Sequence, residues 1–147
     1  MLKYITVLIA GIVSFALAGC AHNPYAVQPA EYSLIASYVD AYNDRDIDAM
    51  AALMSEDIQW LSVERDKIEV FANGKQDLIE QMTDYFTSPS VTTSTLDGAI
   101  NDGNFLAVRE IAQWSGQDGQ RHEQSALAIY EIEKGLVSRV WYYPSSN

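Results

Sequence analysis

Residues 105–143 read FLAVREIAQWSGQDGQRHEQSALAIYEIEKGLVSRVWYY. β-branched and aromatic residues fill this stretch, and glycines with polar residues typical of hairpin turns interrupt it at 115–120 and 133–135. With the preceding segment, which ends in an Asn-Asp-Gly-Asn turn, it predicts long strands at 91–100, 105–114, 121–132 and 136–143. Because short turns join antiparallel neighbours, we expect these four strands to form an antiparallel meander.

The residues upstream of the strands predict three helices. Apolar residues recur at helical spacing within residues 31–43, and Pro29 is tolerated in the first turn of a helix. A short second helix follows Asp46, a residue type that caps helix N-termini, and a third follows Asn73-Gly74. A short strand at 58–63 separates the second helix from the third. Helices followed by a meander predict an α+β fold, with three N-terminal helices packed on a strongly curved, mainly antiparallel sheet.

The N-terminal residues predict a secretion signal. Lys3 is followed by an apolar run at 4–16 and then by Leu17-Ala18-Gly19-Cys20. This segment resembles the bacterial lipobox, in which the cysteine is acylated and the chain is cut just before it. The alternative is a plain transmembrane anchor, but the apolar run is shorter than the ~20 residues that a spanning helix needs. We therefore expect a lipoprotein signal peptide at 1–19 and a lipidated Cys20.

The rest of the chain divides into a tether and one domain. Residues 20–29 hold Pro24 and Pro29 without apolar periodicity, so they predict an extended tether, and residues 30–147 suffice for a single domain. The lipid would hold the domain on a membrane of the bacterial cell envelope, facing the periplasm or the exterior. Ala21 after the cysteine resembles lipoproteins that diderm bacteria release to the outer membrane.

Charge and composition exclude two classes of function. The formal net charge is −11, which repels phosphate backbones, so we expect no nucleic-acid partner. Cys20 is the only cysteine and the chain has two histidines, so a site made of several Cys or His ligands is excluded and we expect neither a metal nor another cofactor.

Two stretches resemble the nuclear transport factor 2-like superfamily, which includes ketosteroid isomerase, scytalone dehydratase and the SnoaL-type polyketide cyclases. They are YVDAYNDRDIDAM at 38–50 and AIYEIEKGLVSRVWYY at 128–143. The resemblance covers residues 31–143 and implies a cone-shaped domain, with an apolar pocket between the first helix and the concave face of the sheet. The fold hosts unrelated enzymes and binding modules, so the polar residues in the pocket decide the activity.

Glu110 is the main catalytic candidate. Side chains alternate along a strand, and Glu110 shares its parity within 105–114 with Leu106, Val108, Ala112 and Trp114. A carboxyl on this apolar face would be desolvated, which raises its pKa toward the range useful for a general base. The alternative places Glu110 near a rim or in an ion pair with an arginine.

The next strand supplies further candidates. The corresponding parity carries His122, Gln124 and Tyr130, and the last two are expected to line the pocket. His122 suits a base or a proton shuttle, but its place beside the Gly119 turn also suits a solvated side chain.

The resemblance to ketosteroid isomerase places Tyr38 on the tyrosine that hydrogen-bonds the substrate oxyanion in that enzyme. The position of the proton-shuttling aspartate is Ser62 here, and the acidic partner of the oxyanion site falls near Ala128. Two of three catalytic groups are therefore absent, which argues against steroid isomerisation by the known mechanism. Tyr38 is either a hydrogen-bond donor to a ligand or a core residue with a satisfied hydroxyl.

Aromatic residues suggest both a pocket and an interface. Trp60, Trp114 and Tyr142 suit either a stacking pocket for a flat ligand or ordinary core packing. The last strand is apolar on both parities, with Val140 and Tyr142 on one side and Trp141 and Tyr143 on the other. A sheet with one solvated face lacks this pattern, so we expect a homodimer through the outer face of the sheet.

The sequence favours an envelope lipoprotein that binds a small apolar or aromatic ligand or a protein partner, without assured catalysis. The expected ligand-binding residues are Trp60, Ser62, Trp114, Gln124, Tyr130 and Tyr142. The alternative is a small isomerase, dehydratase or cyclase with Glu110 as general base and Tyr38 or His122 as donor or acid. A third possibility is a structural lipoprotein that acts only through its sheet surface.

Overall fold

A single six-stranded sheet forms the body of the protein, with strand order β2-β1-β6-β5-β4-β3. The computed structural model describes residues 29–116 and 118–144, so the signal peptide, Cys20 and residues 21–28 of the predicted tether lie outside the described residues. Its elements, in chain order, are α1 (Pro29–Asn43), α2 (Ile47–Ala52), β1 (Met54–Glu64), β2 (Lys67–Asn73), α3 (Lys75–Phe86), β3 (Thr93–Asp102), β4 (Phe105–Ser115), β5 (Arg121–Glu133) and β6 (Leu136–Pro144).

The meander predicted for the last four strands is confirmed. β3, β4, β5 and β6 follow one another in the sheet, and each neighbouring pair is antiparallel. The last strand joins the sheet to the first two strands, because β6 pairs with β1 in parallel and β1 pairs with β2 antiparallel. One parallel pair in six strands makes the sheet mainly antiparallel, as expected.

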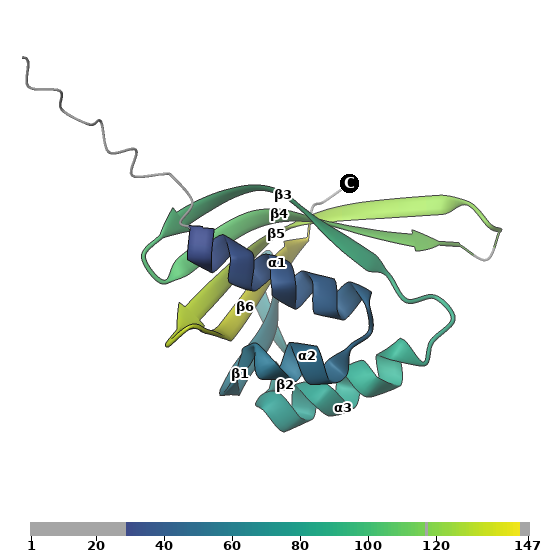
Figure 1. Ribbon diagram of the computed structural model, residues 1–147. Helices are drawn as coiled ribbons and strands as arrows, with labels where there is room; N and C mark the ends of the chain where they lie inside the picture. Colours follow the sequence, from purple (N-terminus) through teal and green to yellow (C-terminus); the bar gives the residue numbers. More distant parts are fainter. Residues whose placement is uncertain (1–28, 117, 145–147) are drawn as a thin grey trace, which may run out of the picture.

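The helices cover the concave face of the curved sheet. Figure 1 shows α1 lying across this face, with α2 and α3 grouped near β1 and β2. The core lies between the two layers, where buried side chains of α1, α2 and α3 meet those of the strands; the largest of them include Ile35, Tyr38, Met50, Leu78, Val108, Tyr130 and Val140. The mixed α+β arrangement is therefore confirmed, although two strands, and not the single predicted one, separate α2 from α3.

Local sequence signals explain two of the chain reversals. Asp46 caps α2, because its carboxylate accepts a hydrogen bond of 2.9 Å from the backbone N–H of Ala49. At the β5–β6 turn, Lys134 and Gly135 both have positive φ, of 54° and 77°. Two positive φ values in a two-residue turn match the right-handed twist of the flanking strands, which fixes the register of this hairpin.

β2 is the element that the sequence did not predict. Of its seven residues only Ala72 is buried, while Ile68, Val70 and Phe71 are exposed. Apolar residues do alternate along the strand, at Ile68, Val70 and Ala72, but only the last of them is covered. Its place at the edge of the sheet, beyond a register shift between Trp60 and Leu61, explains this pattern.

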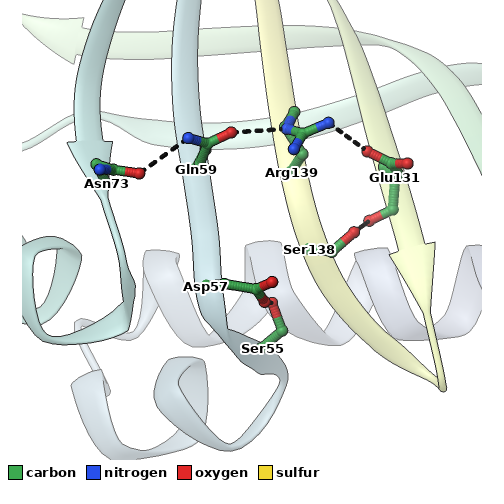
Figure 2. A network of polar contacts seen from close by, with 7 residues as sticks. All are labelled: Ser55, Asp57, Gln59, Asn73, Glu131, Ser138 and Arg139. Atoms are coloured by element: carbon green, nitrogen blue, oxygen red, sulfur yellow. Dashed lines mark hydrogen bonds and ion pairs between the residues drawn. The ribbon is translucent and has the colours of Figure 1, made fainter.

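A chain of polar side chains crosses the outer face of the sheet (Figure 2). The amide of Gln59 on β1 donates to Asn73 on β2 and accepts from Arg139 on β6, both at 2.9 Å. Arg139 also pairs with Glu131 on β5 at 3.1 Å. These contacts join four strands and fix the parallel β1–β6 pair, whose partners lie 80 residues apart.

Candidate functional site

One cavity opens between α3 and the inner face of the sheet. Its volume is about 490 Å³. The apolar lining comes from Trp60, Phe71, Met82, Ala112, Ala126 and Pro144, and the polar lining from Ser62, Glu64, Gln81, Glu110, Gln124 and Tyr142, together with Ser125. The sequence placed the pocket beside the first helix. In the structure α3 supplies the helical wall, because side chains of α1 such as Ile35 and Tyr38 are packed into the core.

Glu110 is the buried acid of this cavity. It lies on β4 opposite Leu96 of β3 and Ala126 of β5, and only 9% of its surface is exposed. The Tyr130 hydroxyl donates a hydrogen bond of 2.7 Å to its Oε2 atom. The hydroxyls of Ser94 and Tyr142 also hydrogen-bond to this carboxyl. Strand alternation thus predicted the orientation of Glu110, and its partners come from the two neighbouring strands, β3 and β5, and from β6.

Burial raises the pKa of the Glu110 carboxyl above its ordinary value. The hydrogen bonds from Tyr130, Ser94 and Tyr142 act in the opposite direction, because they stabilise the carboxylate, but they do not cancel the loss of hydration. Within the described part of the chain, the ion pairs do not include Glu110. The alternative of a salt bridge with arginine therefore does not apply within that part.

Trp60 and Tyr142 form an aromatic wall beside Glu110, and Tyr38 lies behind it. The rings of Trp60 and Tyr142 meet edge to face, with centroids 5.6 Å apart. The indole N–H of Trp60 donates a hydrogen bond of 3.1 Å to the Tyr38 hydroxyl. Tyr38 is 1% exposed and packs edge-on against Tyr130, so it supports the wall from behind and does not line the cavity.

Two of the sequence candidates lie elsewhere. Trp114 stacks on His122 with ring centroids 5.7 Å apart, toward the end of the β4–β5 hairpin. His122 is exposed and lies 3.8 Å from the Asp118 carboxylate. Neither residue lines the cavity, which corrects the expected place of Trp114 and agrees with the solvated alternative for His122. The inward parity of β4 continues to Trp114, but the helices do not cover that end of the strand, as Figure 1 shows.

Of the remaining candidates, some line the cavity and one lies behind the residues that line it. Ser62 and Gln124 line the cavity, as the sequence predicted. Tyr130 does not line it, because its side chain is fully buried behind Glu110 and Tyr142, with its hydroxyl 3.5 Å from that of Tyr142. It therefore holds Glu110 in place without reaching the space that a ligand would fill.

Sequence reasoning missed Ser94 and the residue that fixes it, Asn43. The Asn43 side chain at the end of α1 accepts a hydrogen bond of 2.7 Å from the Ser94 backbone N–H and donates one of 2.8 Å to the Ser94 carbonyl. This side chain replaces a neighbouring strand at the edge of the sheet and sets the position of the Ser94 hydroxyl near Glu110. No local pattern shows this pairing, because 51 residues separate the partners.

Replacing Asn43 by alanine is expected to lower the free energy of unfolding by about 1–2 kcal/mol, because two partly buried backbone groups lose their partners. Urea unfolding of the full chain measures the effect. Asn104→Ala, at an exposed turn position, is the control and should change stability by less than about 0.5 kcal/mol. Equal effects of the two substitutions would contradict a specific role for Asn43.

The described residues offer no metal centre and no membrane span. In residues 29–116 and 118–144, no group of three or more His, Cys, Asp or Glu side chains is placed to hold a metal ion. No helix in this part of the chain is long and apolar enough to cross a membrane.

Comparison with known families gives one match that covers most of the chain. The family described as the SnoaL-like domain matches residues 35–140, which include every strand from β1 to β5 and most of β6. No curated protein sequence matches this chain.

Solved structures share the same fold at low sequence identity. A candidate ketosteroid isomerase from Kribbella flavida is 22% identical, with 80% of this chain and 79% of that chain covered and a TM-score of 0.62. A protein with a ketosteroid isomerase-like fold from Catenulispora acidiphila, solved with trimethylamine, is 8% identical, with 80% and 86% covered and a TM-score of 0.64. TerC, co-crystallised with polyporic acid, is 13% identical, with 79% and 92% covered and a TM-score of 0.65. At these identities the likeness establishes the fold alone.

Proposed function

This chain belongs to the family of SnoaL-like domains, and from that premise we propose that its cavity binds one small, mainly apolar or aromatic organic molecule. The observation that carries the proposal is the polarity of the cavity: carbon-rich walls with a hydrogen-bonded carboxyl at Glu110. Pockets for small ligands have this composition, in which a few polar groups fix the orientation of a ligand held by apolar surface.

The size and walls of the cavity support the proposal. Its volume of about 490 Å³ suits a molecule of one or two rings. Trp60 and Tyr142 offer aromatic surface, and Phe71 at the edge strand lines the cavity although 54% of its surface is exposed. Two proteins of the same fold were crystallised with small organic molecules, trimethylamine and polyporic acid. Those ligands belong to those proteins, but they support a binding function for the cavity.

The test is a titration of the isotope-labelled full chain with 4-tert-butylphenol, followed through the indole N–H signals in the NMR spectrum. The Trp60 signal is expected to shift, because its ring lines the cavity, whereas that of Trp114 stays in place. Ala112→Phe fills the cavity and should weaken binding at least about tenfold. Ala107→Phe, on the opposite face of the same strand, is the matched control. Saturable binding that Ala112→Phe leaves unchanged would place the ligand elsewhere.

A second candidate function is proton transfer at a carbon next to a carbonyl group, with Glu110 as general base. The Tyr142 hydroxyl, which hydrogen-bonds to this carboxyl in the free protein, would turn to the substrate and donate to the developing oxyanion. The basic form of Glu110 increases as the pH rises through its pKa, and the rate should rise with it; because burial raises this pKa, the rise should lie at higher pH than for an ordinary carboxyl. Hydrogen–deuterium exchange of 2-tetralone measures this step directly. Glu110→Gln should slow enzyme-dependent exchange at least about 100-fold, and an unchanged rate would exclude Glu110 as the base.

The proposal includes a lipid anchor at Cys20 and a place in the bacterial cell envelope, with the outer membrane favoured in a diderm host. The lipobox-like segment Leu17-Ala18-Gly19-Cys20 and the tether that follows it support this location. Expression of the full chain in a bacterium with radiolabelled palmitate tests it. The chain is expected to carry label and to sediment with membranes, and Cys20→Ala should abolish labelling. Label that persists in Cys20→Ala would overturn the anchor.

The proposal also includes a homodimer through the outer face of the sheet. Ile100, Phe105, Leu127 and Tyr143 are exposed on the strands there, and the half-buried Trp141 lies beside Phe105 with the Arg139 guanidinium above its ring. Sedimentation equilibrium should detect the dimer, and Trp141→Ala should weaken it. Tyr32→Ala, on the exposed side of α1, serves as the control. A monomer at all concentrations would contradict this part of the proposal.

A further inference from the structure

We propose that the molecule held in this cavity is an organic cation, with an ammonium group seated against Glu110 and beside the rings of Trp60 and Tyr142. The inference rests on the proposed function, because it names the chemical class of ligand for the same cavity. Four features of the described residues carry it: the sign of the charges around the cavity, the unpaired state of the buried carboxyl, the orientation of the aromatic wall, and the groups that titrate near Glu110.

The charged residues that line the cavity are both acidic. Glu110 lies inside and Glu64 lies on the exposed end of β1. In the part of the chain that the structure describes, no lysine, arginine or histidine lines the cavity. The whole chain has a net charge of −11, so the potential at the cavity attracts cations and repels anions. Arg65 and Lys67 lie beside Glu64 in the adjoining surface hollow, so the acidic character concerns the inside of the cavity, where an anionic ligand would meet Glu110 without a compensating base.

The buried carboxyl has hydrogen-bond donors but no positive partner. The hydroxyls of Tyr130, Tyr142 and Ser94 orient it and stabilise its charge in part. A buried carboxylate normally requires a cation beside it, because hydroxyl dipoles do not replace the lost hydration completely. Within the described residues no side chain supplies this charge. A bound ammonium group would supply it from the open side of the cavity.

The aromatic wall suits the same kind of group. The planes of Trp60 and Tyr142 stand at 72° to each other, so together they form a corner of the cavity. The indole N–H of Trp60 is committed to the Tyr38 hydroxyl, so Trp60 offers the cavity its ring and not a donor. An aromatic ring attracts a cation that lies within about 6 Å of its centre, and the attraction increases when water is excluded.

The groups around Glu110 make the preference depend on pH. The charge of Glu110 acts on four tyrosines, and burial, together with this charge, raises the pKa of each above its ordinary value; they are Tyr38 and Tyr42 on α1, Tyr130 on β5 and Tyr142 on β6. The raised pKa values keep these tyrosines protonated near neutral pH, so Glu110 is the group inside the cavity whose ionisation a bound cation would change. A cation favours the ionised form of Glu110, so binding should release a proton when the carboxyl is protonated beforehand.

The experiment compares two probes of the same shape that differ in charge: 4-trimethylammoniophenol is a cation and 4-tert-butylphenol is neutral. Calorimetric titrations of the full chain in two buffers of different ionisation enthalpy give both the affinity and the number of protons released. The cation is expected to bind at least about tenfold more tightly than the neutral probe at neutral pH, where the phenol of each probe keeps its proton. This preference should decline as the pH falls through the pKa of Glu110, with proton release only for the cation.

Glu110→Gln is the decisive variant, because it keeps the shape of the side chain and removes its charge. It should abolish the preference for the cation and its proton release, because it weakens binding of the cation more than binding of the neutral probe. Glu64→Gln, at the mouth, should reduce the preference less, because water screens an exposed charge. Equal binding of both probes to the unmodified chain would overturn the inference and leave the proposed function intact. Failure of both probes to bind would overturn the proposed function itself.

Discussion

Tyr130→Ala is expected to lower the free energy of unfolding by about 3–5 kcal/mol, a large fraction of the stability of a single domain. Tyr130 is fully buried, packs edge-on against Tyr38 and donates its hydroxyl hydrogen to Glu110. Truncation therefore leaves a void beneath α1 and removes a donor from a buried carboxyl at the same time. Urea unfolding of the full chain at neutral pH measures the loss.

Two further variants separate these causes. Tyr130→Phe keeps the ring and removes only the hydroxyl, so it should cost about 1–3 kcal/mol, the range for a buried group that loses its partner. It should also raise the pKa of Glu110 further, because one stabilising hydrogen bond to the carboxylate is lost. Tyr32→Ala removes a tyrosine that is 37% exposed on α1 and should cost less than about 1 kcal/mol. A loss for Tyr130→Ala no greater than that for Tyr32→Ala would contradict its place in the core.

Glu110→Gln is expected to make the protein more stable than the unmodified chain at neutral and alkaline pH. The folded-state pKa of Glu110 is raised above the ordinary value of 4.5, which applies to the unfolded chain. Below about pH 4.5 the carboxyl is protonated in both the folded and the unfolded state, so its ionisation does not lower the free energy of unfolding. As the pH rises toward the folded-state pKa, the unfolded chain loses its proton first, so the native state loses stability relative to it. Each unit of raised pKa corresponds to about 1.4 kcal/mol.

The difference in unfolding free energy between Glu110→Gln and the unmodified chain should therefore grow with pH and level off above the folded-state pKa. Urea unfolding at several values between about pH 4 and pH 8 measures this curve. Glu133→Gln, at an exposed position of β5, controls for the change in net charge and should give a nearly flat difference. A difference for Glu110→Gln that stays constant across this range would mean that the carboxyl carries no desolvation penalty in the folded protein.

A stabilising substitution at Glu110 has a functional meaning. Proteins keep an unfavourable buried charge where binding or catalysis needs it, even though stability is lost. If Glu110→Gln stabilises the fold and abolishes cation preference, the carboxyl is retained for its ligand. Its position, with three hydroxyl donors and one side open to the cavity, is consistent with this role.

Much of the fold was predictable from local sequence. The four strands of the meander, the short helix after Asp46 and the helix after Asn73-Gly74 all appear within about two residues of their predicted positions. Their signals are local: turn residues, capping residues and the period of apolar side chains. β2 was missed because the strand is short: its alternating residues Ile68, Val70 and Ala72 occupy only the seven positions Lys67–Asn73 between a turn and the third helix.

The sequence predicted a residue of the candidate site only where the alternation of side chains along one strand was enough to give its position. Parity placed Glu110 on the inner face, and the structure agrees. The same parity placed Trp114 there too, yet Trp114 lies toward the β4–β5 turn beside His122, outside the cavity. Parity gives the face of the sheet on which a side chain lies, but not whether another layer covers that point along the strand.

The sequence by itself therefore determined the class of fold, the order of the meander and the inward direction of Glu110, because each of these depends on residues near one another in the chain. Only the tertiary structure decided which residues surround that carboxyl. Tyr130 and Tyr142 come from later strands, Ser94 is placed by Asn43 on α1, and the helical wall of the cavity is α3. These partners are separated by tens of residues, and the curvature of the sheet and the packing of the helices bring them together, which no local pattern encodes.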